Sequence, residues 1–195
     1  MKQLFELTPF FTNIWYTQLD DYSYLIPFVH ELRNKKPKTD NTRWISDTYY
    51  SYYTNEIMKP LLDNVKECLI PIYNKLKVSS DVVLNNYWFN INNKWNYNMV
   101  HRHAGTYFSC VVYLKVPKNS GNIVFERPDM LHDYIQFYEQ NNYNQHGFWI
   151  DPEPNKLVMF PSYLSHYTEQ NFTEEFDDER ISAENTEFDP LTPFT

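Results

Sequence analysis

Three of the six histidines in this chain have a spacing that suits metal binding. His101 and His103 lie two residues apart in "NMVHRHAGTYFSCVVYLKV", just before a segment that is predicted to be a buried strand. In an extended segment, residues i and i+2 point to the same face, so the two imidazoles can converge on one point. His166 follows a second apolar segment, "KLVMF", much later in the chain. A ligand pair from an early strand and one ligand from a late strand are what pairing across a jelly roll requires.

Three further residues are candidates for holding an anionic co-substrate. Arg180, in "ERIS", offers the planar fork that suits a carboxylate, and Ser182 points to the same face. Tyr113 places a phenol in an otherwise apolar strand. Each has a simpler interpretation, since Arg180 could pair with the acidic run "TEEFDDER" and Tyr113 could be an ordinary core tyrosine. The order of all these residues along the chain is more specific, and it favours a mononuclear Fe(II) held by imidazoles with a dicarboxylic co-substrate anchored by Arg180.

With these residues in this order, the sequence resembles the 2-oxoglutarate- and Fe(II)-dependent oxygenases common in bacteria and tailed phages, relatives of prolyl 4-hydroxylases. The resemblance covers about residues 84–188. It implies a double-stranded β-helix, metal ligation and catalysis by His101, His103 and His166, and binding of the far carboxylate of 2-oxoglutarate by Arg180 and Ser182, with Tyr113 assisting. The segments that carry it are "YWFNINNKWNYNMVHRH", "FSCVVYLKVPKNSGNIVFERP", "KLVMFPSYLSH" and "ERIS".

The first metal-binding segment departs from the usual pattern of this superfamily, which is HxD or HxE within a two-histidine, one-carboxylate triad. His103 occupies the expected carboxylate position if His101 is the first ligand, and the site then has three histidines. If His103 is the first ligand, Gly105 falls at the carboxylate position. That alternative leaves an open coordination place, as in the related halogenases, where chloride fills it.

The resemblance implies an enzyme that uses Fe(II), 2-oxoglutarate and dioxygen to hydroxylate a substrate, with a peptidyl proline as the candidate by analogy. We expect the aromatic connection at 129–150 to contact the substrate, because functional loops extend from a rigid scaffold. One rival interpretation is a non-catalytic jelly-roll module that binds other proteins or serves in a capsid or tail. Another is a cupin-like dioxygenase with three histidines and no 2-oxoglutarate, and Arg180 argues against it.

Composition excludes several other classes of protein. The chain of 195 residues has a net charge of −8, which disfavours binding to nucleic acid. With only 3 glycines, none of the glycine-rich phosphate-binding loops can be written. Cys68 and Cys110 are both predicted to be reduced core residues, which is typical of a reducing compartment. Without a long apolar run or a signal peptide, we expect a soluble cytoplasmic protein that does not bind membranes.

The pattern of elements predicts an α+β protein in which helices precede strands in hairpin succession. We expect one domain over 1–195, with an N-terminal helical part at about 1–80 and a jelly-roll core at about 81–188. The last strand, after Arg180, is expected to be short. The predicted helices lie at 23–32, interrupted by Pro27, and from Ile57 to Leu76, and the predicted strands at 82–92, 107–116, 122–127 and 156–161.

Overall fold

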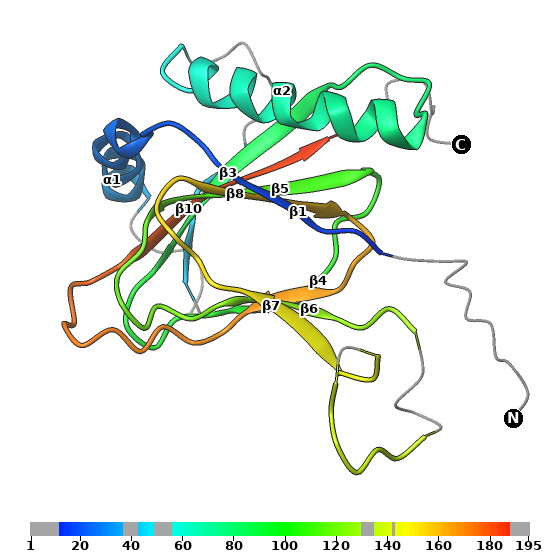
Figure 1. The fold of residues 1–195 in the computed structure, drawn as a ribbon. Coiled ribbons are helices and arrows are strands. Elements are labelled where there is room, and N and C mark those ends of the chain that lie inside the picture. The colour runs from blue at the N-terminus through cyan, green and yellow to red at the C-terminus, as the bar shows by residue number, and fades with distance from the viewer. Residues whose placement is uncertain (1–11, 37–42, 49–55, 130–134, 142, 188–195) are drawn as a thin grey trace, which may run out of the picture.

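Two antiparallel sheets face each other in the computed structural model, and two helices lie on the outer side of the larger sheet (Figure 1). The structure describes residues 12–36, 43–48, 56–129, 135–141 and 143–187. The expected α+β class, a jelly roll with flanking helices near the N-terminus, is confirmed. Among the described residues, no helix combines the length and the apolar character needed to span a membrane.

The larger sheet has six strands and the smaller sheet has four. In spatial order the larger sheet contains β1 (Trp15–Gln18), β8 (Lys156–Pro161), β5 (Phe108–Lys115), β10 (Arg180–Glu187), β3 (Leu84–Asn92) and β2 (Trp44–Ile45). The smaller sheet contains β4 (Asn98–His101), β9 (His166–Thr168), β6 (Ile123–Glu126) and β7 (Gly147–Ile150). The helical elements are η1 (Ser23–Leu25), α1 (Ile26–Lys35) and α2 (Lys59–Leu76).

The four predicted strands and both predicted helices are present, with ends shifted by a few residues. Pro27 does not interrupt the first helix, because it occupies the first turn of α1, where a missing N–H has no partner to lose. The expectation of a short last strand was wrong. β10 has eight residues and lies between β5 and β3, so pairing on both sides stabilises it. The N-terminal part also supplies β1 and β2 to the larger sheet.

Alternation along the strands of the larger sheet separates two cores. On one face, residues such as Phe89, Val112 and Ala183 pack against the helices. On the other face, Val111, Tyr113 and other side chains fill the space between the two sheets. The face of β3 and β10 that lies toward the smaller sheet is polar, because Asn90, Asn92, Arg180, Ser182 and Glu184 are all buried there.

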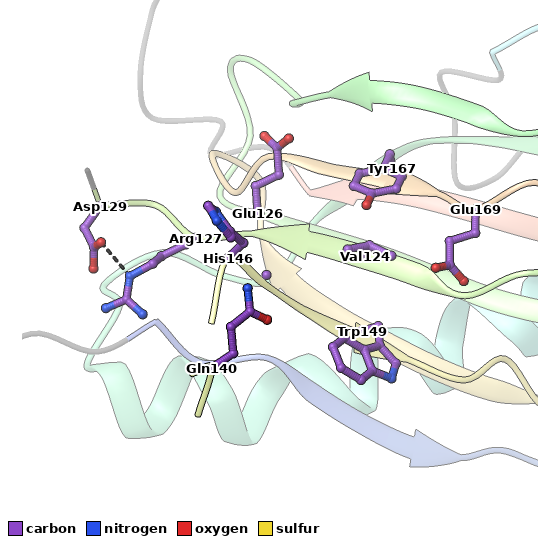
Figure 2. Close-up of a pocket in the computed structure, with 10 residues that line it drawn as sticks. Val124, Glu126, Arg127, Asp129, Gln140, His146, Trp149, Tyr167 and Glu169 are labelled. Carbon is purple, nitrogen blue, oxygen red and sulfur yellow. Dashed lines mark hydrogen bonds and ion pairs between the residues drawn. The ribbon is translucent and has the colours of Figure 1, made fainter. Parts of the chain in front are cut away.

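The smaller sheet has an outer face as well, and that face carries a hollow of about 590 Å³ (Figure 2). Val124 of β6, Trp149 of β7 and Tyr167 just after His166 line it. Because successive residues of a strand point to opposite faces, His166 lies on the inner side of β9. The described part of the 129–150 connection borders this outer hollow; residues 130–134 and 142 lie outside the described residues.

Candidate metal centre and co-substrate site

His101 and His166 are brought together by strand pairing. β4 and β9 are antiparallel neighbours, and His101 is the register partner of His166. The centroids of their rings lie 4.3 Å apart. Pairing of an early and a late strand therefore brings these two residues to one place.

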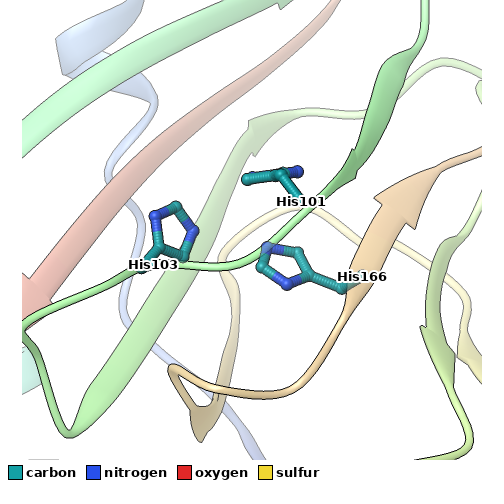
Figure 3. A group of neighbouring side chains, drawn as sticks. All are labelled: His101, His103 and His166. Carbon is teal, nitrogen blue, oxygen red and sulfur yellow. The ribbon is translucent and has the colours of Figure 1, made fainter.

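His103 completes the cluster from just beyond the end of β4. Its backbone N–H donates to the carbonyl of Ser162 at 3.0 Å, which ties this segment to the end of β8. Its ring centroid lies 4.9 Å from that of His101 and 5.2 Å from that of His166 (Figure 3). One ligand nitrogen from each of the three rings lies within 4.8 Å of the other two. Three imidazoles at this spacing suit a first-row metal ion such as Fe(II).

Two of the three rings are oriented by backbone carbonyls. Nδ1 of His101 lies 2.8 Å from the carbonyl of Met99, and Nδ1 of His166 lies 2.9 Å from the carbonyl of Leu164. When Nδ1–H donates in this way, Nε2 keeps its lone pair for a metal. The residues present therefore fit a metal ion in their donor atoms as well as in their spacing.

The surroundings of the cluster keep His103 and His166 neutral. Burial, and next the neighbouring His101, lower the pKa of His103 to about 4 and that of His166 to about 3. His166 packs against Phe160 at 4.6 Å between ring centroids, and His103 packs against Trp88 at 5.4 Å. Neutral imidazole is the form that ligates a metal, so the site is prepared for binding at neutral pH.

Arg180, Tyr113 and Ser182 form a second polar group inside the barrel. Nη1 of Arg180 donates to the carbonyls of Ser120 at 2.6 Å and Gly121 at 2.8 Å. Ser182 is the register partner of Tyr113 and shares a face of β10 with Arg180. All three side chains are buried. Arg180 does not pair with the acidic run that precedes it, because two backbone carbonyls hold its guanidinium.

Two hydrogen-bond donors of this group are buried and have no acceptor, namely Nη2 of Arg180 and the hydroxyl of Tyr113. Burial raises the pKa of Tyr113, and Arg180 lies close enough that its charge opposes this rise. Buried donors in native proteins are almost always satisfied. A carboxylate would accept from both donors and balance the charge of the guanidinium. The donor set thus fits the far carboxylate of a dicarboxylic co-substrate.

The two polar groups share an apolar wall. Tyr113 belongs to the cluster of buried side chains that contains Phe125 and Phe160. Both phenylalanines contact the ring of His166. The three-histidine cluster and the Arg180 group therefore line the same interior between the two sheets.

A family model described as "Putative 2OG-Fe(II) oxygenase" matches residues 86–185, which is slightly more than half of the chain. This stretch contains all three histidines, Tyr113, Arg180 and Ser182. The chain belongs to the 2OG-Fe(II) oxygenase family. It is accordingly an oxygenase that uses Fe(II) and 2-oxoglutarate, as its resemblance to this family implied.

Solved structures of several such enzymes share the fold of this oxygenase. A prolyl-4-hydroxylase from Pseudomonas putida superposes with a TM-score of 0.62 at 14% identity, covering 91% of this chain and 93% of that one. HygX from Streptomyces hygroscopicus, solved with nickel and 2-oxoglutarate bound, gives 0.62 at 12% identity over 92% and 84% of the two chains. A Trichoplax adhaerens prolyl hydroxylase in complex with a hypoxia inducible factor peptide fragment gives 0.59 at 14% identity over 89% and 83%. No curated protein matches the sequence.

The structure adds residues that the sequence prediction missed. Glu184 lies on the same face of β10 as Arg180 and Ser182, and its carboxylate is buried. Trp88 and Asn90, on the facing side of β3, are its neighbours across the sheet. The signal was present in the alternation of "RISAE", because a residue two positions beyond Ser182 shares its face.

Proposed function

We propose that this oxygenase is a hydroxylase in which His101, His103 and His166 all hold the iron. The convergence of one ring nitrogen from each residue carries the proposal. Gly105 lies in the turn beyond His103, with a φ of 75°, so it has a conformational role of its own. The inclusion of His103 in the cluster favours three ligating histidines over a site with chloride at Gly105.

We further propose that Arg180 and Ser182 bind the far carboxylate of 2-oxoglutarate, with Tyr113 assisting. The support is the pair of buried donors, Nη2 of Arg180 and the Tyr113 hydroxyl, which an incoming carboxylate would satisfy. The carbonyls of Ser120 and Gly121 hold the other guanidinium nitrogen and fix the plane of the fork. A co-substrate bound here would be oriented before the reaction, which reduces the entropy lost in reaching the transition state.

When bound, iron and 2-oxoglutarate supply the oxidising chemistry, in which decarboxylation to succinate is coupled to hydroxylation of the substrate. The side chains of the protein bind and orient the iron and the co-substrate, and they exclude water. Phe125 and Phe160 form a dry wall beside His166, and the carbonyls of Met99 and Leu164 keep two ligand rings in place. These contributions are those expected of a rigid scaffold around a metal.

We propose a peptidyl proline as the substrate, by analogy with the fold neighbours that are prolyl hydroxylases. The free, core-facing Cys68 and Cys110 support a reducing, cytoplasmic location. The contributions of β1 and β2 to the larger sheet support the proposal that 1–195 is one oxygenase domain.

The test is an anaerobic titration with Fe(II), with and without 2-oxoglutarate, followed by a succinate assay over proline-containing peptides. One equivalent of iron should bind, 2-oxoglutarate should tighten it, and a proline peptide should stimulate succinate release. Iron binding that is indifferent to 2-oxoglutarate would instead favour a three-histidine dioxygenase without this co-substrate. A dependence of turnover on chloride would favour the halogenase-like alternative.

A further inference from the structure

Glu184 is a buried carboxylate that faces the interior of the barrel. It lies in the middle of β10, and only 7% of its surface is exposed. The amide of Asn90 donates to Oε1 of Glu184 at 2.6 Å. Nε of Arg43 in turn donates to Oδ1 of the same amide at 2.9 Å. Asn90 therefore holds Glu184 in place and links it to the guanidinium of Arg43.

Within the described part of the chain, Glu184 has no ion pair. Burial raises the pKa of its carboxyl group, and His101 opposes this rise most, followed by Arg43. Burying a carboxylate is costly unless a positive charge is near. The group that most opposes the rise in this pKa is thus a member of the histidine cluster.

Trp88 connects Glu184 to a second histidine of the cluster. Trp88 is the register partner of Glu184 across β3 and β10, so the two side chains lie side by side on the inner face. Burial raises the pKa of the Glu184 carboxyl group, and the neighbouring indole of Trp88 is among the groups that oppose this rise. The same indole packs against the ring of His103, with centroids 5.4 Å apart and planes inclined by 46°.

A three-histidine centre has only neutral ligands, whereas the usual triad contributes one negative charge. A carboxylate outside the ligand set can supply that charge through space, and partners of this kind typically change metal affinity 10- to 100-fold. We propose that Glu184 is a positioning residue of this kind: it provides the negative charge that the ligand set lacks and, through Trp88, orients the ring of His103. This inference rests on the proposed role of the three histidines.

The first test measures Co(II) binding, because Co(II) reports both its affinity and its ligand geometry in the visible spectrum. Glu184→Gln keeps the size of the side chain and removes the charge, and it should weaken Co(II) binding about 10-fold and shift the visible bands. Glu126→Gln is the matched control, since Glu126 is a half-buried carboxylate on the outer face of the smaller sheet. The control should bind Co(II) as the wild type does.

The second test asks whether Glu184 acts through the ligand set. His103→Asp places a carboxylate among the ligands, so the further loss on Glu184→Gln should be clearly smaller in that background. Trp88→Phe keeps an aromatic ring against His103 and removes the N–H donor, so it should shift the Co(II) bands while changing the affinity less than Glu184→Gln does. If Glu184→Gln does not fold, two other variants test the inference. The Co(II) bands of Trp88→Phe should shift, and the Co(II) affinity of Glu184→Asp should stay close to that of the wild type.

Wild-type Co(II) affinity and an unchanged spectrum in Glu184→Gln would overturn the inference. So would an equal loss in the wild-type and His103→Asp backgrounds, or an effect only on the KM for a cationic peptide, which would make Glu184 a substrate-binding residue. If the wild type itself does not bind Co(II), the proposed function fails instead. The two failures are therefore distinguishable.

Discussion

His101 and His166 are paired twice, once as register partners of β4 and β9 and once as rings whose centroids lie 4.3 Å apart. The strand pairing sets the separation of their backbones, and the hydrogen bonds to Met99 and Leu164 set the direction of their rings. The metal site is therefore part of the sheet, and His103 adds to it from the segment that follows.

Each of the three histidines is expected to be needed for metal binding. Replacing His101, His103 or His166 by Ala should reduce Fe(II) affinity at least 10-fold, because each removes one ligand. Anaerobic titration monitored by calorimetry measures the effect. His146→Ala is the control, since His146 lines the outer hollow of the smaller sheet and should have no effect (Figure 2). Wild-type affinity in His103→Ala would remove His103 from the ligand set.

His103→Asp separates a ligand from a residue that merely packs nearby. If His103 ligates, a carboxylate at the same position should restore much of the Fe(II) affinity that His103→Ala loses, because carboxylate and imidazole both suit Fe(II). The comparison of Fe(II) dissociation constants for the two variants is the measurement. Equal affinities for His103→Asp and His103→Ala would mean that His103 acts only as a neighbour of the ligands.

Arg180→Lys is expected to weaken 2-oxoglutarate binding by about 10- to 100-fold, because an ammonium cannot supply the planar fork and a charge-assisted hydrogen bond contributes about 1.5–3 kcal/mol. Tyr113→Phe removes a single neutral donor and should cost less, about tenfold or below. Arg33→Lys is the control, because Arg33 pairs with Glu179 and does not belong to the co-substrate group. Titration of the iron-loaded enzyme with 2-oxoglutarate provides the numbers, and a parallel loss of Fe(II) affinity would make Arg180 structural.

Gly121 is expected to tolerate no side chain. Its φ is +81°, and a Cβ would lie 2.6 Å from the carbonyl oxygen of Glu169. Gly121→Ala should therefore destabilise the protein by about 1–2 kcal/mol or more. Because the carbonyl of Gly121 also accepts from Arg180, 2-oxoglutarate affinity should fall while Fe(II) affinity stays the same. Thermal unfolding and the two titrations test this, and a loss of stability with unchanged 2-oxoglutarate affinity would contradict the second part.

The metal-free protein is expected to lose stability as the pH falls below about 6.5. The pKa of His166 is about 3 in the folded protein, so the unfolded chain takes up its proton first. Above about pH 6.5 the ring of His166 is neutral in both the folded and the unfolded state. Below that pH, the free energy of unfolding falls by about 1.4 kcal/mol per pH unit until the folded pKa is reached. Urea unfolding between pH 7.5 and 5 should give a steeper decline for the wild type than for His166→Asn. If the free energy of unfolding declines equally in both proteins, the pKa of His166 is not lowered in the folded state.

The sequence was sufficient for the parts of this site that depend on local periodicity. Two histidines at i and i+2 had to share a face, and the strand from Phe108 to Lys115 followed from its run of β-branched and aromatic residues. The order of His166 and Arg180 after that strand supported the family resemblance. These features need only neighbouring residues, so no knowledge of tertiary contacts was required.

The remainder depends on contacts that a single sequence does not encode locally. β10 was expected to be short because "RISAENTEF" is less strand-like than the usual tail after the arginine in this family, but β3 and β5 pair with both of its edges and satisfy its backbone. Alternation along "RISAE" places Glu184 on the face of Ser182, but its burial in the barrel depends on the strand pairing that sets it opposite Trp88. Tertiary pairing overrides strand propensity in such cases.

The most direct measurement is an anaerobic crystal structure of the enzyme with Fe(II) and 2-oxoglutarate. We expect ring nitrogens of His101, His103 and His166 at about 2.1 Å from one iron, the usual length of a metal–imidazole bond. We also expect the far carboxylate of 2-oxoglutarate to accept hydrogen bonds from Arg180 and Tyr113. An iron held by only two of these histidines, with His103 turned away and chloride or water in its place, would contradict the three-histidine centre.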